Sequence, residues 1–380
     1  MNNLIKLILF FLFSNNLLYA QDISDKQVVI EVYNKLVTAY GNAKTAPNLE
    51  IISSKNFQPT PAVYYASPKP TIKVDIHLLS ICDRFVEDSA NALSIIIAHE
   101  LAHYYNDHTF CTDFAFAVRK KDNEFSNKLK ALSKTEKLAL ETEADHKGLF
   151  YSCMAGYNPF NVYPKLLDAI YNAYNLTDNN ESYPTKAERK AINSQARLKV
   201  QELYTIFSEG VSANKNGDYD KAINNFELLN NYFPSRENFN NLGVSRVMKA
   251  LTFKPLSRDA YLNPGRFSYP LAIDKESRLN QPHQTRSLNE GDFIIMQDLL
   301  KKAQKDFEKA ISLDDSYVQS YINLACVFDL LGNPMAAIGK INELSKKDQK
   351  SREVMLILAI AYYNLDMDDK AEEIWKILKL

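Results

Sequence analysis

The chain has 380 residues, which is long enough for two domains. It carries 45 Lys and Arg residues against 46 Asp and Glu residues, for a formal net charge of −1. A balance this close to neutral argues against nucleic acid or an anionic membrane as the main partner.

The first twenty residues have the pattern of a signal peptide. Lys6 supplies a positive charge, residues 7–13 form a short apolar core, and Ala20 is a small residue before a plausible cleavage site. The core is too short to predict a membrane-spanning helix, and no later apolar run approaches about twenty residues. We therefore expect an exported, periplasmic protein without a membrane span in its mature chain. An uncleaved anchor, or secretion from the cell, is the alternative.

Two short runs, residues 62–66 and 71–76, are rich in β-branched and aromatic residues and lie between prolines. They predict strands of a small sheet, and the sequence does not decide which of them lies at its edge. Four cysteines follow without a CxxC pair, which excludes a zinc knuckle. Spacing does not decide whether some of them form disulfides or remain buried thiols; they are Cys82, Cys111, Cys153 and Cys326.

The most informative motif is His99-Glu100-Leu101-Ala102-His103, an HExxH pattern. Residues 89–98 lead into it without Gly or Pro and predict a helix. On a helix, His99 and His103 share a face and can bind one metal ion. Glu100 would then lie beside the ion, where it can accept a proton from water. The alternative is a pair of histidines that face solvent or the core.

A catalytic zinc site needs a third protein ligand. The extended HExxHxxGxxH arrangement fails, because Asn106 and Thr109 stand where Gly and His are required. A second helix is predicted from the capping pair Ser133 and Glu136 to about Ala155, with a glycine stop. It carries acidic residues that can supply the missing ligand.

Within this second helix, Glu141 and Asp145 are four residues apart and share a face, whereas Glu143 points elsewhere. Glu141 is therefore the predicted third ligand. Asp145 is predicted to hold the tautomer of a metal-binding histidine by accepting its other ring N–H. The alternative for Asp145 is a solvated charge on the helix surface.

These motifs support a family resemblance. The runs HELAHYYNDH and ETEADHKGLFYSCMAGYNP, at residues 99–108 and 141–159, resemble the zinc peptidase family that includes HtpX, the CAAX prenyl endopeptidase and BepA. The resemblance covers roughly residues 45–195. It implies an α+β zincin domain of the gluzincin type, in which an extended substrate adds to an edge strand. It also implies zinc ligands at His99, His103 and Glu141, with Glu100 as the general base.

The chain departs from the family where members often have His-Pro followed by Arg. Here Tyr183 precedes Pro184, and Arg189 follows. A Tyr hydroxyl can donate a hydrogen bond to an oxyanion, so Tyr183 is a candidate oxyanion stabiliser, with a packed aromatic residue as the alternative. We expect Arg189 to be structural and to hold this segment in place. His108 and His146 are expected to be local structural residues.

From about residue 200 the sequence resembles tetratricopeptide repeats. Ala303, Ala337 and Ala371 recur with a period of 34. Small residues such as Gly243 mark positions on each first helix where the paired helix packs closely. We predict four repeats over about residues 203–380, the alternative being a generic helical bundle. The first repeat carries Gly210, Gly217, Tyr219, Ala222, Phe226 and Pro234 at pattern positions.

The second predicted repeat is interrupted by an insertion at 252–292, between helices at 237–251 and 293–313. Its aromatic residues favour an ordered segment over a solvated linker. The sequence thus predicts a mainly α protein with a small sheet, in three parts. They are a signal peptide at 1–20, a metallopeptidase domain at 21–198 and an all-α repeat solenoid at 199–380.

The two modules together predict an exported zinc metalloendopeptidase that hydrolyses peptide bonds in proteins. The repeats would bind substrates or partner proteins of the cell envelope or outer membrane, in protein quality control. The last expectation follows from the resemblance to BepA-like proteins alone. The alternative is a periplasmic chaperone or assembly factor with a latent protease site.

Overall fold

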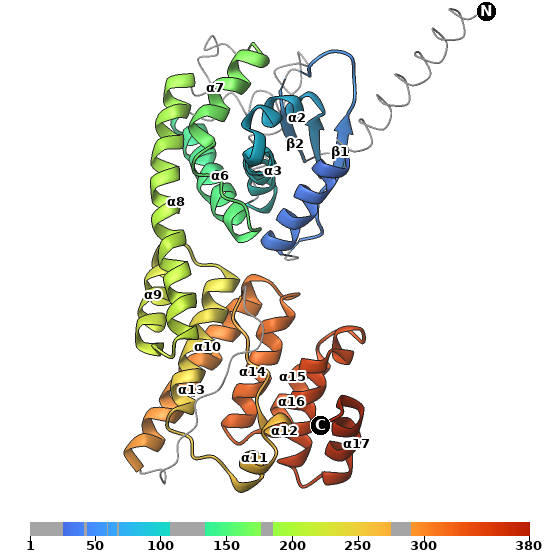
Figure 1. The fold of residues 1–380 in the computed structure, drawn as a ribbon, viewed down its shortest axis with the longest axis vertical. Coiled ribbons are helices and arrows are strands. Elements are labelled where there is room, and N and C mark those ends of the chain that lie inside the picture. Colours follow the sequence, from blue (N-terminus) through green and yellow to red (C-terminus); the bar gives the residue numbers. More distant parts are fainter. Residues whose placement is uncertain are drawn as a thin grey trace, which may run out of the picture. The chain divides into compact units, whose positions relative to one another are not determined.

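The computed structural model describes residues 26–41, 44–58, 60–66, 68–106, 134–175, 185–274 and 290–380. These residues are mainly helical and include one small sheet of three strands, which confirms the predicted mainly α fold with a small sheet (Figure 1). The chain separates into two compact units, Met1–Tyr204 and Thr205–Leu380. The predicted signal peptide lies outside the described residues. Among the described helices, none has the length and apolar character needed to cross a membrane.

The sheet of the first unit has the strand order β1-β3-β2. The predicted strands are confirmed as β2 (Ala62–Tyr65) and β3 (Thr71–Asp75), whereas β1 (Asn48–Ile52) was not predicted. β3 is central, and its Ile72 and Val74 are fully buried. β1 pairs with it in parallel and β2 antiparallel, so β1 and β2 are the two edges.

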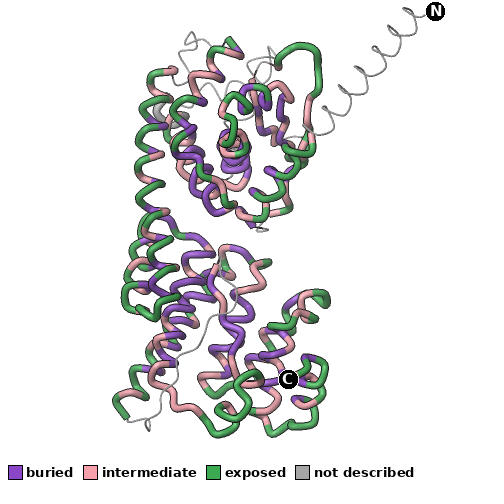
Figure 2. Tube along the Cα trace, viewed as in Figure 1, coloured by how far each residue is buried: buried purple, intermediate pink, exposed green. Residues whose placement is uncertain are grey.

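The helices of the first unit pack around α3 (Ser89–Tyr105), the predicted HExxH helix. α3 contacts β2 and β3 as well as α6 (Lys134–Met154), and most of its apolar residues are buried (Figure 2). The predicted end of α6 is confirmed, because Gly156 has a φ of +94° just after the helix. The other helices of this unit are one over residues 26–40, α2 (His77–Cys82), η1 (Asp83–Asp88), α7 (Tyr163–Ala173) and the first part of α8 (Lys186–Lys215).

α3 and α6 approach one another closely at Gly148. A Cβ atom at this position would lie 3.0 Å from the backbone N of His99. A backbone atom in a helix cannot move aside as the end of a flexible side chain can, so only glycine fits here without a shift of one helix. The absence of a side chain at Gly148 therefore sets the distance between the helix that carries the histidines and the helix that carries Glu141.

The second unit is built from helices that pack on their neighbours in the chain. The helices predicted on either side of the insertion are confirmed as α10 and α13. Glycine again permits close packing, because a Cβ at Gly243 of α10 would lie 2.7 Å from the ring of Phe307 in α13. The helices are α9 (Tyr219–Tyr232), α10 (Arg236–Leu251), α13 (Glu290–Leu313), α14 (Val318–Leu330), α15 (Pro334–Asn342), η2 (Asp348–Lys350), α16 (Arg352–Tyr363) and α17 (Asp368–Leu378).

The insertion is ordered over its described part, residues 252–274, and contains two short helices, α11 (Arg258–Leu262) and α12 (Pro264–Phe267). The ring of Phe267 packs against Trp375, with ring centroids 5.4 Å apart. Arg266 forms an ion pair with Glu372 at 2.5 Å. Through these two contacts, this part of the insertion packs against the last helices of the chain. Residues 275–289 lie outside the described part.

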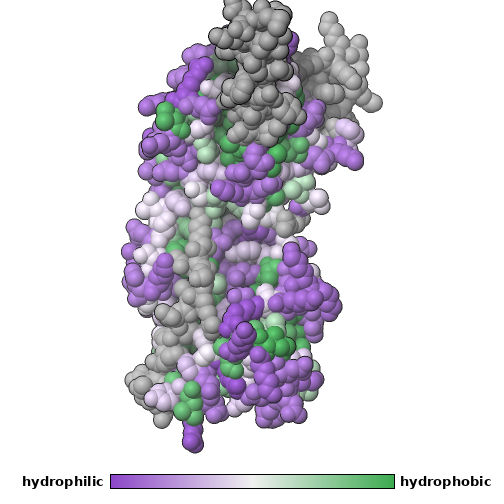
Figure 3. Space-filling view, turned by 45° about the vertical axis from the view of Figure 1, so that its right-hand side comes forward, coloured by the Kyte–Doolittle hydropathy of each residue, from purple (hydrophilic) through white to green (hydrophobic). Residues whose placement is uncertain are grey.

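Hydrophilic residues cover much of the described surface in the view of Figure 3, with smaller apolar areas between them. The largest fully buried side chains include Trp375, Phe150, Phe207, Phe226 and Phe307. Cys82, Cys153 and Cys326 are buried and form no disulfide among the described residues, and Cys111 lies outside the described residues.

Candidate metal centre

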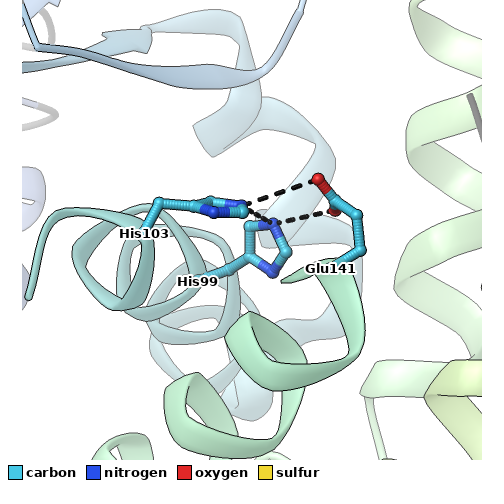
Figure 4. A group of neighbouring side chains, drawn as sticks. All are labelled: His99, His103 and Glu141. Atoms are coloured by element: carbon cyan, nitrogen blue, oxygen red, sulfur yellow. Dashed lines mark hydrogen bonds and ion pairs between the residues drawn. The ribbon is translucent and has the colours of Figure 1, made fainter. Parts of the chain in front are cut away.

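Three side chains from two helices converge in the first unit (Figure 4). Nε2 of His103 lies 3.0 Å from Nε2 of His99. The Glu141 carboxylate lies 3.4 Å from Nε2 of His99 and 3.7 Å from Nε2 of His103. All three side chains are nearly buried, with exposed fractions of 14%, 4% and 2% for His99, His103 and Glu141. The structure thus brings together the three residues predicted as metal ligands.

The donor atoms have the spacing that a tetrahedral metal ion requires. Ligand bonds of about 2.1 Å at the tetrahedral angle place donor atoms about 3.4 Å apart. The three distances here, 3.0, 3.4 and 3.7 Å, lie around that value. The buried group of His99, His103 and Glu141 could therefore hold a metal ion.

Asp145 sets the orientation of the first histidine. Its Oδ1 lies 2.8 Å from Nδ1 of His99. In the neutral ring, Nδ1–H donates to this carboxylate, and the lone pair of Nε2 faces the site. Burial lowers the pKa of His99, but the hydrogen bonds with Asp145 and Glu141 outweigh it and raise the pKa to about 10. The carboxylates of Asp145 and Glu141 thus strongly favour a positive charge at the ring of His99. A bound cation would also supply a positive charge there.

The two carboxylates are balanced by Arg189 from α8. Its Nη1 donates to Oε2 of Glu141 at 2.6 Å, and its Nη2 donates to Oδ1 of Asp145 at 3.3 Å. Burial raises the pKa of each carboxyl, but Arg189 and the histidines outweigh it and lower both pKa values, that of Glu141 strongly. Both groups are therefore ionised. We expected Arg189 to be structural and to hold its segment in place. The contact with Glu141 was not predicted, because the two residues are 48 positions apart in the sequence.

Glu100 lies beside the three residues and is held by the sheet. The backbone N–H of Tyr64 in β2 donates to Oε2 of Glu100 at 2.8 Å. Burial and the neighbouring Glu141 raise the pKa of Glu100, and His99, the Tyr64 N–H and Arg189 only partly offset this. A carboxylate whose pKa is raised is a better proton acceptor than an ordinary one. No sequence signal marked Tyr64, because the interaction uses its backbone.

Tyr163, at the start of α7, is a further neighbour that the sequence did not suggest. Its side chain is buried, and burial together with Asp145 raises its pKa well above the ordinary value. The hydroxyl is therefore protonated and can donate to the Asp145 carboxylate. Gly148 is another residue whose role at the site the sequence did not suggest, because the close approach of α3 and α6 depends on it.

Glu143 and His146 are not part of this group. The side chain of Glu143 is 43% exposed and pairs with Lys147 at 2.7 Å. Nδ1 of His146 lies 2.8 Å from the carbonyl oxygen of Thr142 in its own helix. Tyr183, the candidate oxyanion stabiliser, lies outside the described residues, as does His108.

Comparison of the sequence with known proteins finds no family model and no curated protein that matches it. The chemistry of the site must therefore be inferred from the residues themselves and from their geometry.

Proposed function

We propose that this chain is an exported zinc-dependent metalloendopeptidase with a C-terminal tetratricopeptide-repeat array. The observation that supports this most directly is the convergence of His99, His103 and Glu141 beside Glu100. Two imidazoles and one carboxylate are the donor set of many catalytic zinc sites, in which a fourth position stays open for water or substrate. The buried, ionised carboxylate and the oriented imidazole suit zinc better than calcium or magnesium, which prefer oxygen ligands.

Zinc in this site would polarise the scissile carbonyl group and lower the pKa of a water molecule. Glu100 would accept a proton from that water and deliver it to the leaving amine. The Tyr64 N–H holds one oxygen of Glu100, which fixes the direction of the carboxylate. Asp145 and Arg189 would keep His99 and Glu141 in place during the reaction. Tyr183 remains a candidate to stabilise the oxyanion.

The edge strand β2 favours an extended protein segment as substrate. The N–H of Asp75 bonds to the carbonyl of Pro61, next to β2. In an antiparallel pair of strands, every second residue directs its backbone N–H and C=O groups toward the partner strand, and the residues between direct these groups away. Ala62 and Tyr64 therefore direct their backbone groups away from β3. The bond from Tyr64 to Glu100 agrees with this direction. A substrate strand added at this edge would lie beside the metal centre and be recognised mainly through its backbone.

Export, partners and cellular role are part of the same proposal. Residues 1–20 have the composition of a signal peptide, which supports a periplasmic location. The 34-residue period and the close contact of Gly243 with Phe307 support tetratricopeptide repeats that bind protein partners. The resemblance to BepA-like proteins supports a role in quality control of envelope proteins.

The proposal is tested by zinc content and by cleavage of an unfolded protein such as casein. We expect about one zinc per chain in the wild type. Glu100→Gln should keep zinc and lose cleavage by at least about 100-fold. Glu143→Gln makes the same chemical change on a partly exposed residue and should keep both. Retained cleavage in Glu100→Gln would exclude the proposed base. Absence of zinc in the wild type after reconstitution would favour the chaperone or assembly-factor role.

A further inference from the structure

A non-helical segment of the insertion, residues 268–274, lies against α10 and α14 of the second unit. We call this segment the strap. Its Tyr269, Leu271 and Ile273 are buried, with exposed fractions of 5%, 0% and 1%; Pro270 is buried as well, and Ala272 is only partly buried. The side chains of Tyr269, Leu271 and Ile273 belong to the core of the helical unit. Its backbone groups must therefore find partners away from water.

Three asparagine side chains supply these partners. Nδ2 of Asn323 donates to the carbonyl of Ala272 at 3.0 Å, and the N–H of Ala272 lies 3.3 Å from Oδ1 of Asn323. Nδ2 of Asn240 also reaches the Ala272 carbonyl, at 3.3 Å. The N–H of Asp274 donates to Oδ1 of Asn241 at 2.7 Å. These contacts recognise the backbone of the strap and not the identity of its side chains.

The asparagines are held in position by one another. Nδ2 of Asn323 donates to Oδ1 of Asn240 at 2.9 Å, and Oγ of Ser320 donates to the same oxygen at 3.0 Å. Asn240, Asn241, Asn323 and Ser320 are all fully buried. Buried amides are costly unless they are paired, so this arrangement is suited to a peptide backbone and to little else.

The side chains of the strap occupy separate sites beside these amides. The hydroxyl of Tyr269 donates to Oδ2 of Asp329 at 2.7 Å, and Asn364 donates to the same oxygen at 2.8 Å. Leu271 and Ile273 pack among the core residues of the unit. An aromatic residue and two aliphatic residues at alternate positions thus complete the contact.

The helices pack together through contacts that do not include the strap. The Phe307 ring of α13 lies over Gly243 of α10, for example, independently of residues 268–274. Side-chain amides that bind a backbone, with sites for alternate side chains, are how proteins recognise extended peptides. The strap therefore has the contacts of a bound peptide ligand that happens to belong to the same chain.

We infer that Asn240, Asn241 and Asn323 form a clamp for peptide backbone, and that the strap is its intramolecular occupant. A non-helical segment of a partner protein with an aromatic residue followed by aliphatic residues at alternate positions displaces the strap and binds in its place. This inference rests on the partner-binding part of the proposed function and names the kind of segment that binds.

The test uses the full chain and a fluorescent peptide with the strap sequence, SYPLAID. The double variant Leu271→Asp/Ile273→Asp weakens the hold of the strap and leaves the asparagines unchanged. We expect it to bind the peptide at least about tenfold more tightly than the wild type, in which the strap competes. Adding Asn323→Ala to the double variant should abolish the gain, and a peptide with Asp at both aliphatic positions should not bind. If the folded double variant binds no better than the wild type, the inference is wrong.

Hydrogen exchange in the unmodified chain gives a second measurement that does not depend on the variant folding. An exchangeable strap opens without unfolding of the helices, so the amides of Ala272 and Asp274 should exchange at least about 100-fold faster than core amides of α14. Equal rates would show that the strap is a permanent part of the fold. Neither measurement involves zinc or cleavage, so failure here and failure of the peptidase proposal are distinguishable.

Discussion

Arg189 and Glu141 form a buried ion pair in which Nη1 donates to Oε2 at 2.6 Å. The same carboxylate lies 3.4 Å from Nε2 of His99. Glu141 therefore lies beside both the positively charged guanidinium of Arg189 and the candidate metal position. Arg189 strongly lowers the pKa of Glu141, because its charge outweighs the cost of burying the carboxylate. The guanidinium thus keeps the ligand ionised and limits its rotation before any metal ion binds.

Replacement of this arginine should weaken metal binding. Arg189→Met leaves Glu141 and Asp145 buried without their main counter-charge. We expect zinc affinity to fall by about 10- to 100-fold, measured by competition with a chelator. The metal-free variant should also lose about 3 kcal/mol of unfolding free energy. Lys190→Met, which removes an exposed partner of Asp168, is the matched control and should change neither quantity by much. Unchanged zinc affinity in Arg189→Met would contradict a positioning role.

The choice between the two glutamates of α6 can be tested directly. Glu141→Gln replaces a buried carboxylate beside both histidines and should lose bound zinc, because a neutral amide is a poor zinc ligand. Glu143→Gln changes a partly exposed residue that pairs with Lys147 and should retain about one zinc per chain. Metal content by mass spectrometry distinguishes the two. The reverse result would show that the side chains near His99 are wrongly identified as ligands.

The close approach of α3 and α6 makes a third prediction. Gly148→Ala places a Cβ 3.0 Å from the backbone N of His99, so the helices must shift apart. We expect a loss of about 1–3 kcal/mol in unfolding free energy, together with weaker zinc binding. Gly339→Ala in α15 is the control, because its Cβ would meet no atom within 4 Å. That variant should gain about 0.5–1 kcal/mol. A stabilised Gly148→Ala protein with normal zinc affinity would contradict the packing argument.

Asp306 on α13 should give a pH dependence of stability. Its ion pair with Arg246 only partly offsets burial, which raises the pKa of Asp306 to about 7. The unfolded chain has an ordinary Asp pKa of about 3.9. Between these values the folded protein holds a proton that the unfolded chain has released. The contribution of Asp306 to the free energy of unfolding therefore decreases as pH rises through this range.

The change Asp306→Asn removes this titration. Between about pH 5 and pH 8, we expect the wild type to lose on the order of 2 kcal/mol more unfolding free energy than the variant. Urea unfolding at each pH measures the difference. Glu308→Gln, an exposed change on the same helix, should follow the wild type. Parallel pH curves for the wild type and Asp306→Asn would show that Asp306 is ionised throughout this range.

Local patterns predicted much of the candidate site. The HExxH spacing placed His99 and His103 on one face of α3, and the four-residue spacing of Glu141 and Asp145 placed both on one face of α6. Spacing works here because helical geometry is repeated at every turn. The strand β1 was missed, since its residues, including Asn48 and Glu50, are not the buried, β-branched run that β3 shows.

The sequence by itself determined which side chains share a helix face and where the glycine stops lie, because each depends on neighbours along the chain. Only the tertiary structure decided that Arg189 contacts Glu141, that the Tyr64 N–H holds Glu100 and that the strap lies against Asn240 and Asn323. These contacts join residues 32 to 51 positions apart or use backbone atoms, which every residue type carries. They follow from how helices and strands pack together, and no local residue pattern specifies that packing.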